Sequence, residues 1–343
     1  MDITHTLFIA VVITVLLYDF TNGFHDAADM IATAIASHEI RPSIAILLVG
    51  LFTFLGPFLV GLSVADTVGT FVDISKIEVK LAQSVVIAAL LAAVSYNLLT
   101  WYFALPSSSS NSLAGGLVGA GLMVVGSNHI HWGIKALEDG KLEGLMKVVA
   151  GLLVSPFFAF LVGFIVLKFL LYAFRNFNVK IKPLFIASQY ITISWLGFSH
   201  GANDAQKGMA IIGMMLLASG YTNSFEVPLW AILLCTSAIT LGTIFGGWSI
   251  IKTLGFKIYK IRLIDSVANQ ISAAFTNTIA TTIGAPTSTT QVVTSALLGN
   301  GSARNIKRVN WIVAKNIVLG WIFNIPTSIL LGATYAYLLL KVL

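Results

Sequence analysis

The stretch Ser199–Gly208 reads Ser-His-Gly-Ala-Asn-Asp-Ala-Gln-Lys-Gly and lies inside an otherwise apolar run, Tyr190 to Gly220. It therefore places an amide, a carboxylate and an amine in a hydrophobic segment. An earlier stretch, Thr21–Ala28, reads Thr-Asn-Gly-Phe-His-Asp-Ala-Ala and has the same spacing between its glycine and its aspartate. Polar groups at two matching points of a hydrophobic chain indicate a functional site.

The composition is that of a membrane protein. The chain has 343 residues, of which 57% are hydrophobic and only 10% charged, and its mean hydropathy is +0.90. A soluble domain carries about 25% charged residues. Apolar runs such as Pro42–Val64 and Val148–Tyr172 reach the roughly 20 residues that a spanning helix needs. We predict an all-α polytopic membrane protein.

The chain contains an internal repeat. In each half an aspartate-bearing polar stretch, where we expect the helix to be interrupted, precedes a proline followed by hydroxyl residues. We predict a first repeat over residues 1–175 and a second over residues 176–343. The matched positions are Asn97 and Asn277, Pro106 and Pro286, and Gly119 and Gly299, all at one common offset along the chain, with Gly23 and Gly201 at nearly the same offset.

The distribution of Lys and Arg predicts the orientation of the two repeats. The net charge of +6 comes from basic residues in short loops, so it indicates topology and no nucleic-acid partner is expected. If each proline-broken segment is a re-entrant hairpin, both termini lie outside the cell membrane and the halves are inverted, as in many secondary transporters. The inside loops then hold Arg41, Arg175, Lys180, Lys182, Lys252, Lys257, Lys260, Arg262, Arg304, Lys307 and Arg308. The outside segments hold Lys76, Lys80, Lys135, Lys141, Lys147 and Lys341.

The two Pro-Ser/Thr breaks are candidate oxyanion sites. Proline ends the preceding helix, and the hydroxyl residues after it suit the first turn of a new half-helix. The first N–H groups of that half-helix carry a partial positive charge that an anion can satisfy. Alternatively, the hydroxyl groups only cap the helix ends. The candidate residues are Ser108, Ser109, Ser110 and Asn111 in the first repeat and Ser288, Thr289, Thr290 and Gln291 in the second.

Three carboxylates lie in segments expected at mid-membrane: Asp26, Asp29 and Asp204. A charge there costs at least roughly 2.5–3.5 kcal/mol, so it usually faces a partner or a cavity. A carboxylate shares a site with an anion only if a cation neutralises it. We predict a coupling cation, Na⁺ or H⁺, at Asp26 and Asp204, with Asn22, Asn203 and unwound carbonyls as further ligands. The alternative is that these aspartates cap helices after a break.

Other polar residues near these stretches have open roles. Lys207 lies three residues after Asp204 on the same helix face, where it either contacts the anion or pairs with that aspartate. His25 and His200 flank the breaks and are either structural or proton relays. Asp19, one turn before the first break, is either structural or part of the same cluster.

At these residues the chain resembles the inorganic phosphate transporter (PiT) family. The family motif near the start matches Asn22–Asp29, the Gly-Ala-Asn-Asp-Ala-Gln-Lys motif matches Gly201–Lys207, and the two Pro-x-Ser segments match Pro106–Ser110 and Pro286–Thr290. The resemblance covers essentially the whole chain. It implies cation-coupled uptake of inorganic phosphate, inverted repeats and often a homodimer in the lipid bilayer, with no cofactor and no enzymatic activity.

The chain departs from the family pattern at a few positions. Asn111 and Gln291 stand where the family usually has histidine, and Asp29 replaces an asparagine. The missing histidines favour Na⁺ over protons as the coupling ion. Two other functions stay open: a permease for sulfate or another oxyanion, and, more distantly, an intramembrane aspartyl protease that uses Asp26 and Asp204.

Overall fold

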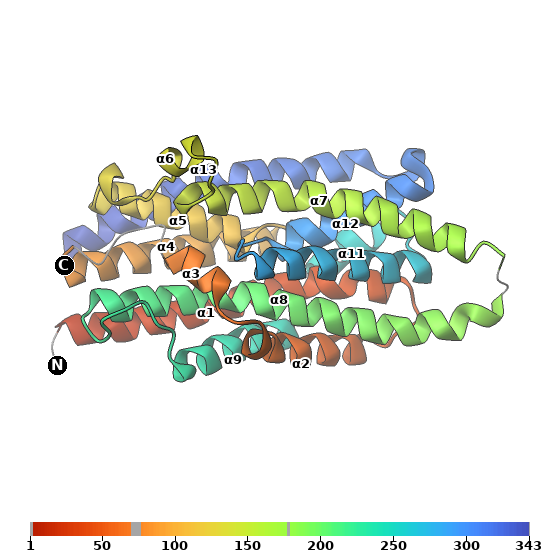
Figure 1. Cartoon of the computed structure of the whole chain (residues 1–343), viewed down its shortest axis with the longest axis horizontal. Helices are drawn as coiled ribbons and strands as arrows, with labels where there is room; N and C mark the ends of the chain where they lie inside the picture. Colours follow the sequence, from red (N-terminus) through yellow and green to blue (C-terminus); the bar gives the residue numbers. More distant parts are fainter. Residues whose placement is uncertain (1–2, 70–76, 177–178, 343) are drawn as a thin grey trace.

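The structure, a computed structural model, describes residues 3–69, 77–176 and 179–342. Its elements within these ranges are all helical (Figure 1). They are α1 (Ile3–Ala36), α2 (Pro42–Val60), α3 (Ser63–Gly69), α4 (Val79–Tyr102), α5 (Ser109–Val124), η1 (Ser127–His129), α6 (Ile134–Glu138), α7 (Gly144–Ala173), η2 (Val179–Ile181), α8 (Lys182–Ala218), α9 (Leu229–Phe245), α10 (Trp248–Phe256), α11 (Leu263–Thr282), α12 (Thr289–Asn305), η3 (Ile306–Arg308) and α13 (Trp311–Val342).

The two helices that carry the aspartate motifs are continuous. The breaks predicted at Asn22-Gly23 and at Gly201–Asp204 are wrong, because α1 and α8 run through these residues without interruption. The glycines serve close packing instead. A Cβ on Gly23 would lie 2.0 Å from the carbonyl oxygen of Ile239 in α9, and a Cβ on Gly201 would lie 2.0 Å from that of Thr53 in α2. The backbone carbonyls of these helices are therefore not unwound to bind a cation.

The chain does break at the two prolines. Between α4 and α5, and again between α11 and α12, an extended segment that contains Pro106 or Pro286 joins two half-helices. Both segments turn through a left-handed residue at the same repeat position, Ala104 with φ +53° and Gly284 with φ +66°. Both half-helices then begin after a serine in the extended conformation. The predicted re-entrant hairpins are confirmed.

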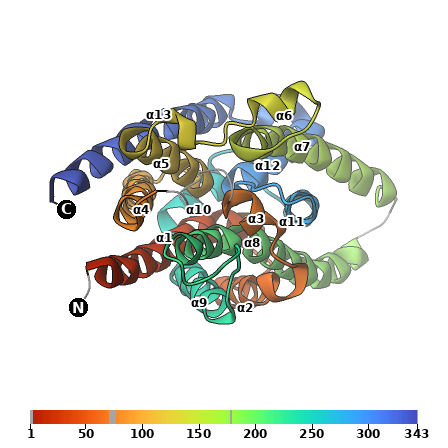
Figure 2. The same cartoon turned by 60° about the vertical axis from the view of Figure 1, so that its left-hand side comes forward.

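The two repeats interlock. In Figure 2, α5 lies against α13 and α12 against α7, so the second half of each hairpin packs on the last helix of the other repeat. Likewise α1 packs against α9, and α2 against α8. This reciprocal packing is what a two-fold inverted arrangement produces. The boundary between residues 175 and 176 stays a prediction.

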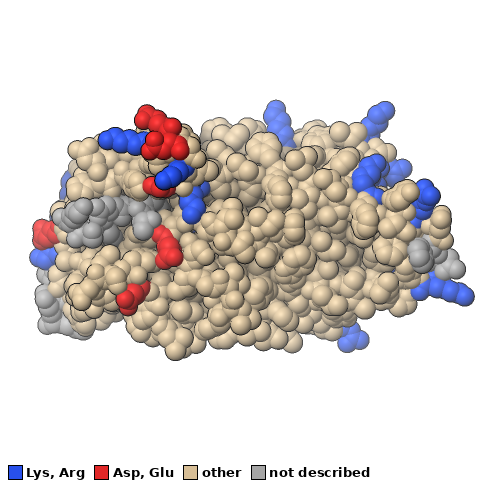
Figure 3. Space-filling model, viewed as in Figure 1, with Lys and Arg blue, Asp and Glu red and all other residues tan. Residues whose placement is uncertain are grey.

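The surface is that of a membrane protein. Five helices within the described residues are long and apolar enough to cross a membrane, or six if the bent pair α9 and Ile250–Phe256 counts as one span. Figure 3 shows a belt with few charged residues between two charged ends, and the end on the right carries mainly Lys and Arg. The loop predicted over Asp66–Lys80 is helical at its start, and its residues 70–76, including Lys76, lie outside the described residues.

Candidate functional site

The tips of the two hairpins meet at the centre of the molecule, and Lys207 of α8 joins them. The Ser110 hydroxyl donates to the carbonyl oxygen of Thr287 at 2.8 Å. The Lys207 ammonium donates to the Ser110 hydroxyl at 2.6 Å and to the same Thr287 carbonyl at 2.7 Å. It also pairs with Asp204 one turn back. Lys207, which the sequence left undecided, therefore both pairs with Asp204 and reaches the two hairpin tips.

Some polar side chains of each tip cap the half-helix, and others are buried without a hydrogen-bond partner in the part of the chain that the structure describes. Ser108 Oγ accepts from the backbone N–H of Asn111 at 3.1 Å, and Ser288 Oγ accepts from that of Gln291 at 3.4 Å. These two serines therefore cap the first turns of α5 and α12. Ser109 Oγ, Asn111 Oδ1 and Gln291 Oε1 are buried without a hydrogen-bond partner among the described residues. The free polar groups thus sit at the positive N-terminal ends of two half-helices.

The carboxylate of the second repeat is fully paired. Asp204 accepts from the Thr289 hydroxyl at 2.8 Å and lies 2.8 Å from His200 Nδ1. Its other oxygen takes the ammonium of Lys207. With a positive charge and two hydrogen-bonding groups around it, this buried aspartate is satisfied without a bound ion.

The carboxylates of the first repeat are not paired in this way. Asp26 accepts from the Thr290 hydroxyl at 2.7 Å, and Asp29 contacts the same hydroxyl. The histidines are more distant from the Asp26 carboxylate: His25 Nδ1 lies 3.8 Å and His200 Nδ1 3.9 Å from its oxygens. Two groups of three residues share Asp26, and in each group one possible ligand atom per residue lies within 4.8 Å of the others. The groups are His25, Asp26 and Asp29, and Asp26, His200 and Asp204. These groups form one titratable cluster at the centre of the fold.

The two asparagines expected to bind the cation have different surroundings. Asn203 Oδ1 accepts from the backbone N–H of Thr287 at 3.0 Å, and its Nδ2 donates to Thr281 and to the Ala285 carbonyl. Asn203 thereby fixes the conformation of the extended segment around Pro286. Both side-chain polar atoms of Asn22 are buried without a partner among the described residues. Asn22 is therefore available to a ligand, whereas the oxygen of Asn203 is already in use.

One supporting residue escaped the sequence analysis, and another was left outside the predicted cation site. Asn324, in the middle of α13, donates to Ser107 Oγ at 3.0 Å and to the Ser108 carbonyl at 2.8 Å, so it holds the first tip as Asn203 holds the second. Its signal was a lone amide in an apolar span. Asp29, which the sequence did not assign to a ligand, contributes directly to the cluster.

Asp19 lies one turn before the cluster on α1. It packs against Gly208 of α8, where a Cβ would lie 2.2 Å from its carboxylate oxygen. The glycine therefore leaves the space that this carboxylate occupies, and α1 and α8 approach each other closely at this level.

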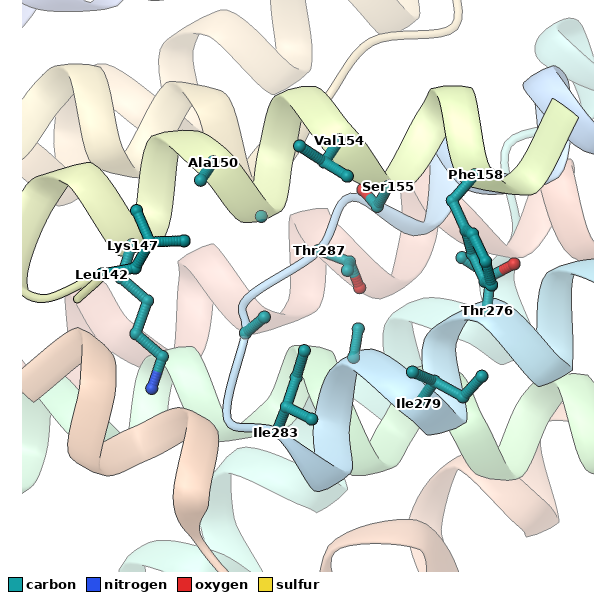
Figure 4. Close-up of a pocket in the computed structure, with 13 residues that line it drawn as sticks. Leu142, Lys147, Ala150, Val154, Ser155, Phe158, Thr276, Ile279, Ile283 and Thr287 are labelled. Atoms are coloured by element: carbon teal, nitrogen blue, oxygen red, sulfur yellow. The ribbon is translucent and has the colours of Figure 1, made fainter. Parts of the chain in front are cut away.

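A cavity of about 290 Å³ lies beside the tip of the second hairpin, between α7 and α11 (Figure 4). Thr287 faces it, and Lys147 lies at its other end. The remaining lining is mostly apolar, with side chains such as Val154, Phe158 and Ile283. A hydrated anion is therefore a poor ligand for this cavity, and the polar cluster at the tips is the better candidate site.

Comparison with known proteins agrees with this geometry. The family model described as "Phosphate transporter family" matches residues 22–180 and again 172–332, one match for each repeat. A probable low-affinity inorganic phosphate transporter of Rhizobium meliloti (strain 1021) is 37% identical over 95% of each chain. One of Bacillus subtilis (strain 168) is 37% identical over 100% of each chain.

A solved structure gives the same result. The chain described as "The sodium-dependent phosphate transporter" superposes with a TM-score of 0.80 at 26% identity, covering 98% of this chain and 100% of its own. The match extends over both repeats and both hairpins. With its duplicated tips, its central lysine and these relatives, this chain belongs to the phosphate transporter family.

Proposed function

We propose that the protein is a secondary transporter that carries inorganic phosphate into the cell together with a cation, by alternating access to the site between the hairpin tips. It lies in the cell membrane as a multi-pass protein with both termini outside, and it forms a homodimer. The basic end of the molecule supports this orientation, because loops rich in Lys and Arg face the cytoplasm.

The observation that carries the proposal is the position of Lys207. Its ammonium touches Ser110 of the first tip and the Thr287 carbonyl of the second. A phosphate oxygen placed there would meet this positive charge and the N-terminal ends of α5 and α12. We assign phosphate to this place, with Ser109 and Ser110 on one side. The second tip contributes Thr289, Thr290 and Gln291. The other residues that we assign to the phosphate site are Ser108, Asn111 and Ser288.

Hydrogen-bond counting at Thr290 supports cation coupling. Its hydroxyl has one hydrogen, yet oxygens of both Asp26 and Asp29 lie within hydrogen-bonding distance. One of the two carboxylates therefore needs a proton or a cation of its own. We assign the coupling cation to Asp26 and Asp29 with Asn22. Asp204 and Asn203, which have other partners, complete the surroundings. The oxygen ligands and the sodium-dependent structural relative favour Na⁺.

The formal charges of the site bear on the order in which the cation and phosphate bind. Asp26, Asp29 and Asp204 carry three negative charges against the single positive charge of Lys207, which leaves two negative charges when the histidines are neutral. A phosphate anion would add to this excess in a buried place. Cations must therefore bind before or together with phosphate, since uncompensated charges in a membrane protein are expensive.

Transport of labelled phosphate into proteoliposomes tests the proposal. We expect uptake under an inward Na⁺ gradient, and its loss in Asp26→Asn and Asp204→Asn. Lys168→Met is the matched control, because it removes a charge from a spanning helix where the lysine lies over the ring of Phe164, outside the site. Uptake that is absent, or that is unchanged in both aspartate variants, contradicts the assignment.

The same assay decides between phosphate and related anions. Unlabelled sulfate in excess should leave phosphate uptake intact, and equal competition by sulfate would make the protein a general oxyanion permease. A proton gradient imposed without Na⁺ separates the two coupling ions. The relatives are named as probable transporters, and Asp204 is paired with Lys207 and His200, which argues against a protease that uses Asp26 and Asp204.

A further inference from the structure

A small basic pocket lies at the opposite end of the α11–α12 hairpin from the transport site. It has a volume of about 60 Å³ and is formed where the start of α11 and the end of α12 come together. A backbone hydrogen bond of 2.8 Å, from the N–H of Asn310 to the carbonyl of Ile258, joins the segment before α11 to the segment after α12. The pocket is lined by Tyr259, Lys260, Arg262, Gly301, Arg304, Asn305 and Arg308.

The charge of this pocket is strongly positive. Four of its lining residues are basic, and Asp265 offsets one of them through bonds of 2.9 and 2.6 Å to the guanidinium of Arg304. Three positive charges are left. Lys260, Arg262 and Arg308 are exposed, so their head groups are free to move onto a ligand. The pocket belongs to the end of the molecule where Lys and Arg predominate in Figure 3.

Tyr259 provides a second, independent observation. Its side chain is 8% exposed, and its hydroxyl is buried without a hydrogen-bond partner among the described residues. Its ring packs on Gly301, where a Cβ would lie 3.0 Å from two ring atoms, so the ring has little freedom to turn away. Buried hydroxyls are almost always hydrogen-bonded. The Tyr259 hydroxyl is therefore free to donate a hydrogen bond to a ligand that lies beside this group of positive charges.

We propose that this pocket binds a phosphate group, supplied either by the head group of an anionic phospholipid or by free inorganic phosphate. Its oxygens would accept from the Tyr259 hydroxyl and from Lys260 and Arg308. Arg262 directly precedes α11, so the first turn of that helix, which Asp265 caps, borders the same site. The site is distinct from the transport site, to which the tip of the same hairpin contributes Thr287–Gln291.

Such a ligand would act on the hairpin as a whole. It would bridge the start of α11 and the end of α12, and so fix the base of the hairpin whose tip contributes to the proposed phosphate site. We infer that occupancy stabilises one arrangement of the hairpin and thereby changes the transport rate. This link to transport depends on the proposed function, whereas binding itself does not.

Thermal unfolding of the full chain in detergent tests binding without any transport assay. The first arm titrates short-chain phosphatidylglycerol, with phosphatidylcholine of the same chain length as the neutral reference. The second arm titrates inorganic phosphate in an Asp204→Asn background, so that the transport site is weakened. The pocket variants are Lys260→Gln with Arg308→Gln, and Tyr259→Phe, which keeps the charge.

The matched control is Lys257→Gln with Lys307→Gln, which removes two exposed charges from the same end but none from the pocket lining. We expect the apparent affinity for one probe to fall about tenfold in the Lys260 and Arg308 double variant, as for the loss of charge-assisted hydrogen bonds. Tyr259→Phe should lower it several-fold, and the control should not.

The arm in which this difference appears identifies the source of the phosphate group. A difference with phosphatidylglycerol alone assigns the pocket to the lipid head group, and one with inorganic phosphate alone assigns it to the free anion. If pocket and control variants respond alike to both probes, the proposal is overturned, whatever the result of the uptake experiments.

Discussion

The two repeats place equivalent positions of α1 and α8 at the centre of the fold and give them different chemistry. Each position of the first motif has its counterpart in the second when Gly23 is aligned with Gly201. Asn22 then corresponds to His200, His25 to Asn203, Asp26 to Asp204 and Asp29 to Lys207. The asparagine and the histidine are exchanged, one aspartate is kept, and the last position changes sign.

Under the proposed function, this difference separates two tasks on one duplicated backbone. Lys207 neutralises Asp204 and extends to both tips, which makes the second motif suited to an anion. Asp29 instead adds a second carboxylate next to Asp26, and both rely on one Thr290 hydroxyl, which makes the first motif suited to a cation. We therefore expect substitutions in the two motifs to have different consequences for phosphate and for cation binding.

The largest effect is expected from Lys207→Met. It removes the positive charge from the proposed phosphate site and leaves Asp204 buried without its ion pair, a change that typically costs about 3–5 kcal/mol. Phosphate uptake should fall below detection, and the unfolding temperature of the purified protein should drop.

The double variant Asp204→Asn with Lys207→Met isolates the effect on stability. It removes both charges, so the unfolding temperature should recover towards that of the original protein while uptake stays absent. If the double variant transports phosphate, Lys207 is a structural partner of Asp204 and has no part in binding the anion.

The second effect concerns the glycines that the two motifs share. Gly23→Ala and Gly201→Ala should each destabilise the fold by about 1–3 kcal/mol, because the added methyl group would collide with a backbone carbonyl of the facing helix. Gly320→Ala is the matched control, since a Cβ there has no atom within 4 Å and alanine favours a helix. Thermal unfolding measures all three. Equal stability of the three variants would contradict the packing role.

The overall fold could be predicted from the sequence to a large extent. Proline and hydroxyl residues act locally on the backbone, so the hairpin tips at Pro106 and Pro286 could be located from the chain alone. Glycine is different, because it permits either an irregular backbone or a close neighbour. The continuous path of α1 through Gly23 depends on Ile239, which belongs to the other repeat, and no local pattern contains that contact.

The candidate site was predictable in its parts more than in their roles. The hydroxyl residues and the aspartates could be identified as candidates because polar groups in a membrane-spanning segment are costly unless they face a partner or a ligand. The role of Lys207 could not be decided, since its partners Ser110 and Thr287 lie far from it in the sequence, one in each hairpin. The partners of Asn203 were hidden for a similar reason, because its oxygen accepts from the Thr287 N–H across the break.

A third, smaller effect is expected from Asp29→Asn. The substitution keeps the shape of the side chain and removes one of the two carboxylates at Thr290. The Na⁺ concentration for half-maximal uptake should rise about tenfold, which corresponds to roughly 1.4 kcal/mol, while the half-saturating phosphate concentration changes little. Uptake measured against Na⁺ and against phosphate distinguishes the two. A change confined to phosphate would place Asp29 on the anion side and reverse the comparison.

The smallest effect tests the symmetry of the two tips themselves. Ala104 and Gly284 occupy the same left-handed position, with φ values of +53° and +66°, but only the second tip has a glycine there. A residue with a Cβ destabilises the folded state by roughly 1–2 kcal/mol in this conformation. Replacing it by glycine removes this cost, but the greater freedom of glycine in the unfolded chain offsets about half of the benefit. Ala104→Gly should therefore raise the stability by about 0.5–1 kcal/mol.

Gly284→Ala, the reciprocal change in the second tip, should lower the stability by more than Ala104→Gly raises it, because its Cβ would also meet the Ser63 carbonyl at 2.8 Å. Thermal unfolding of both variants checks the two signs. A loss of stability in Ala104→Gly would mean that the first tip tolerates its alanine because the strain is relieved elsewhere in the first repeat, so that the two tips are alike in backbone path but not in the forces that hold it.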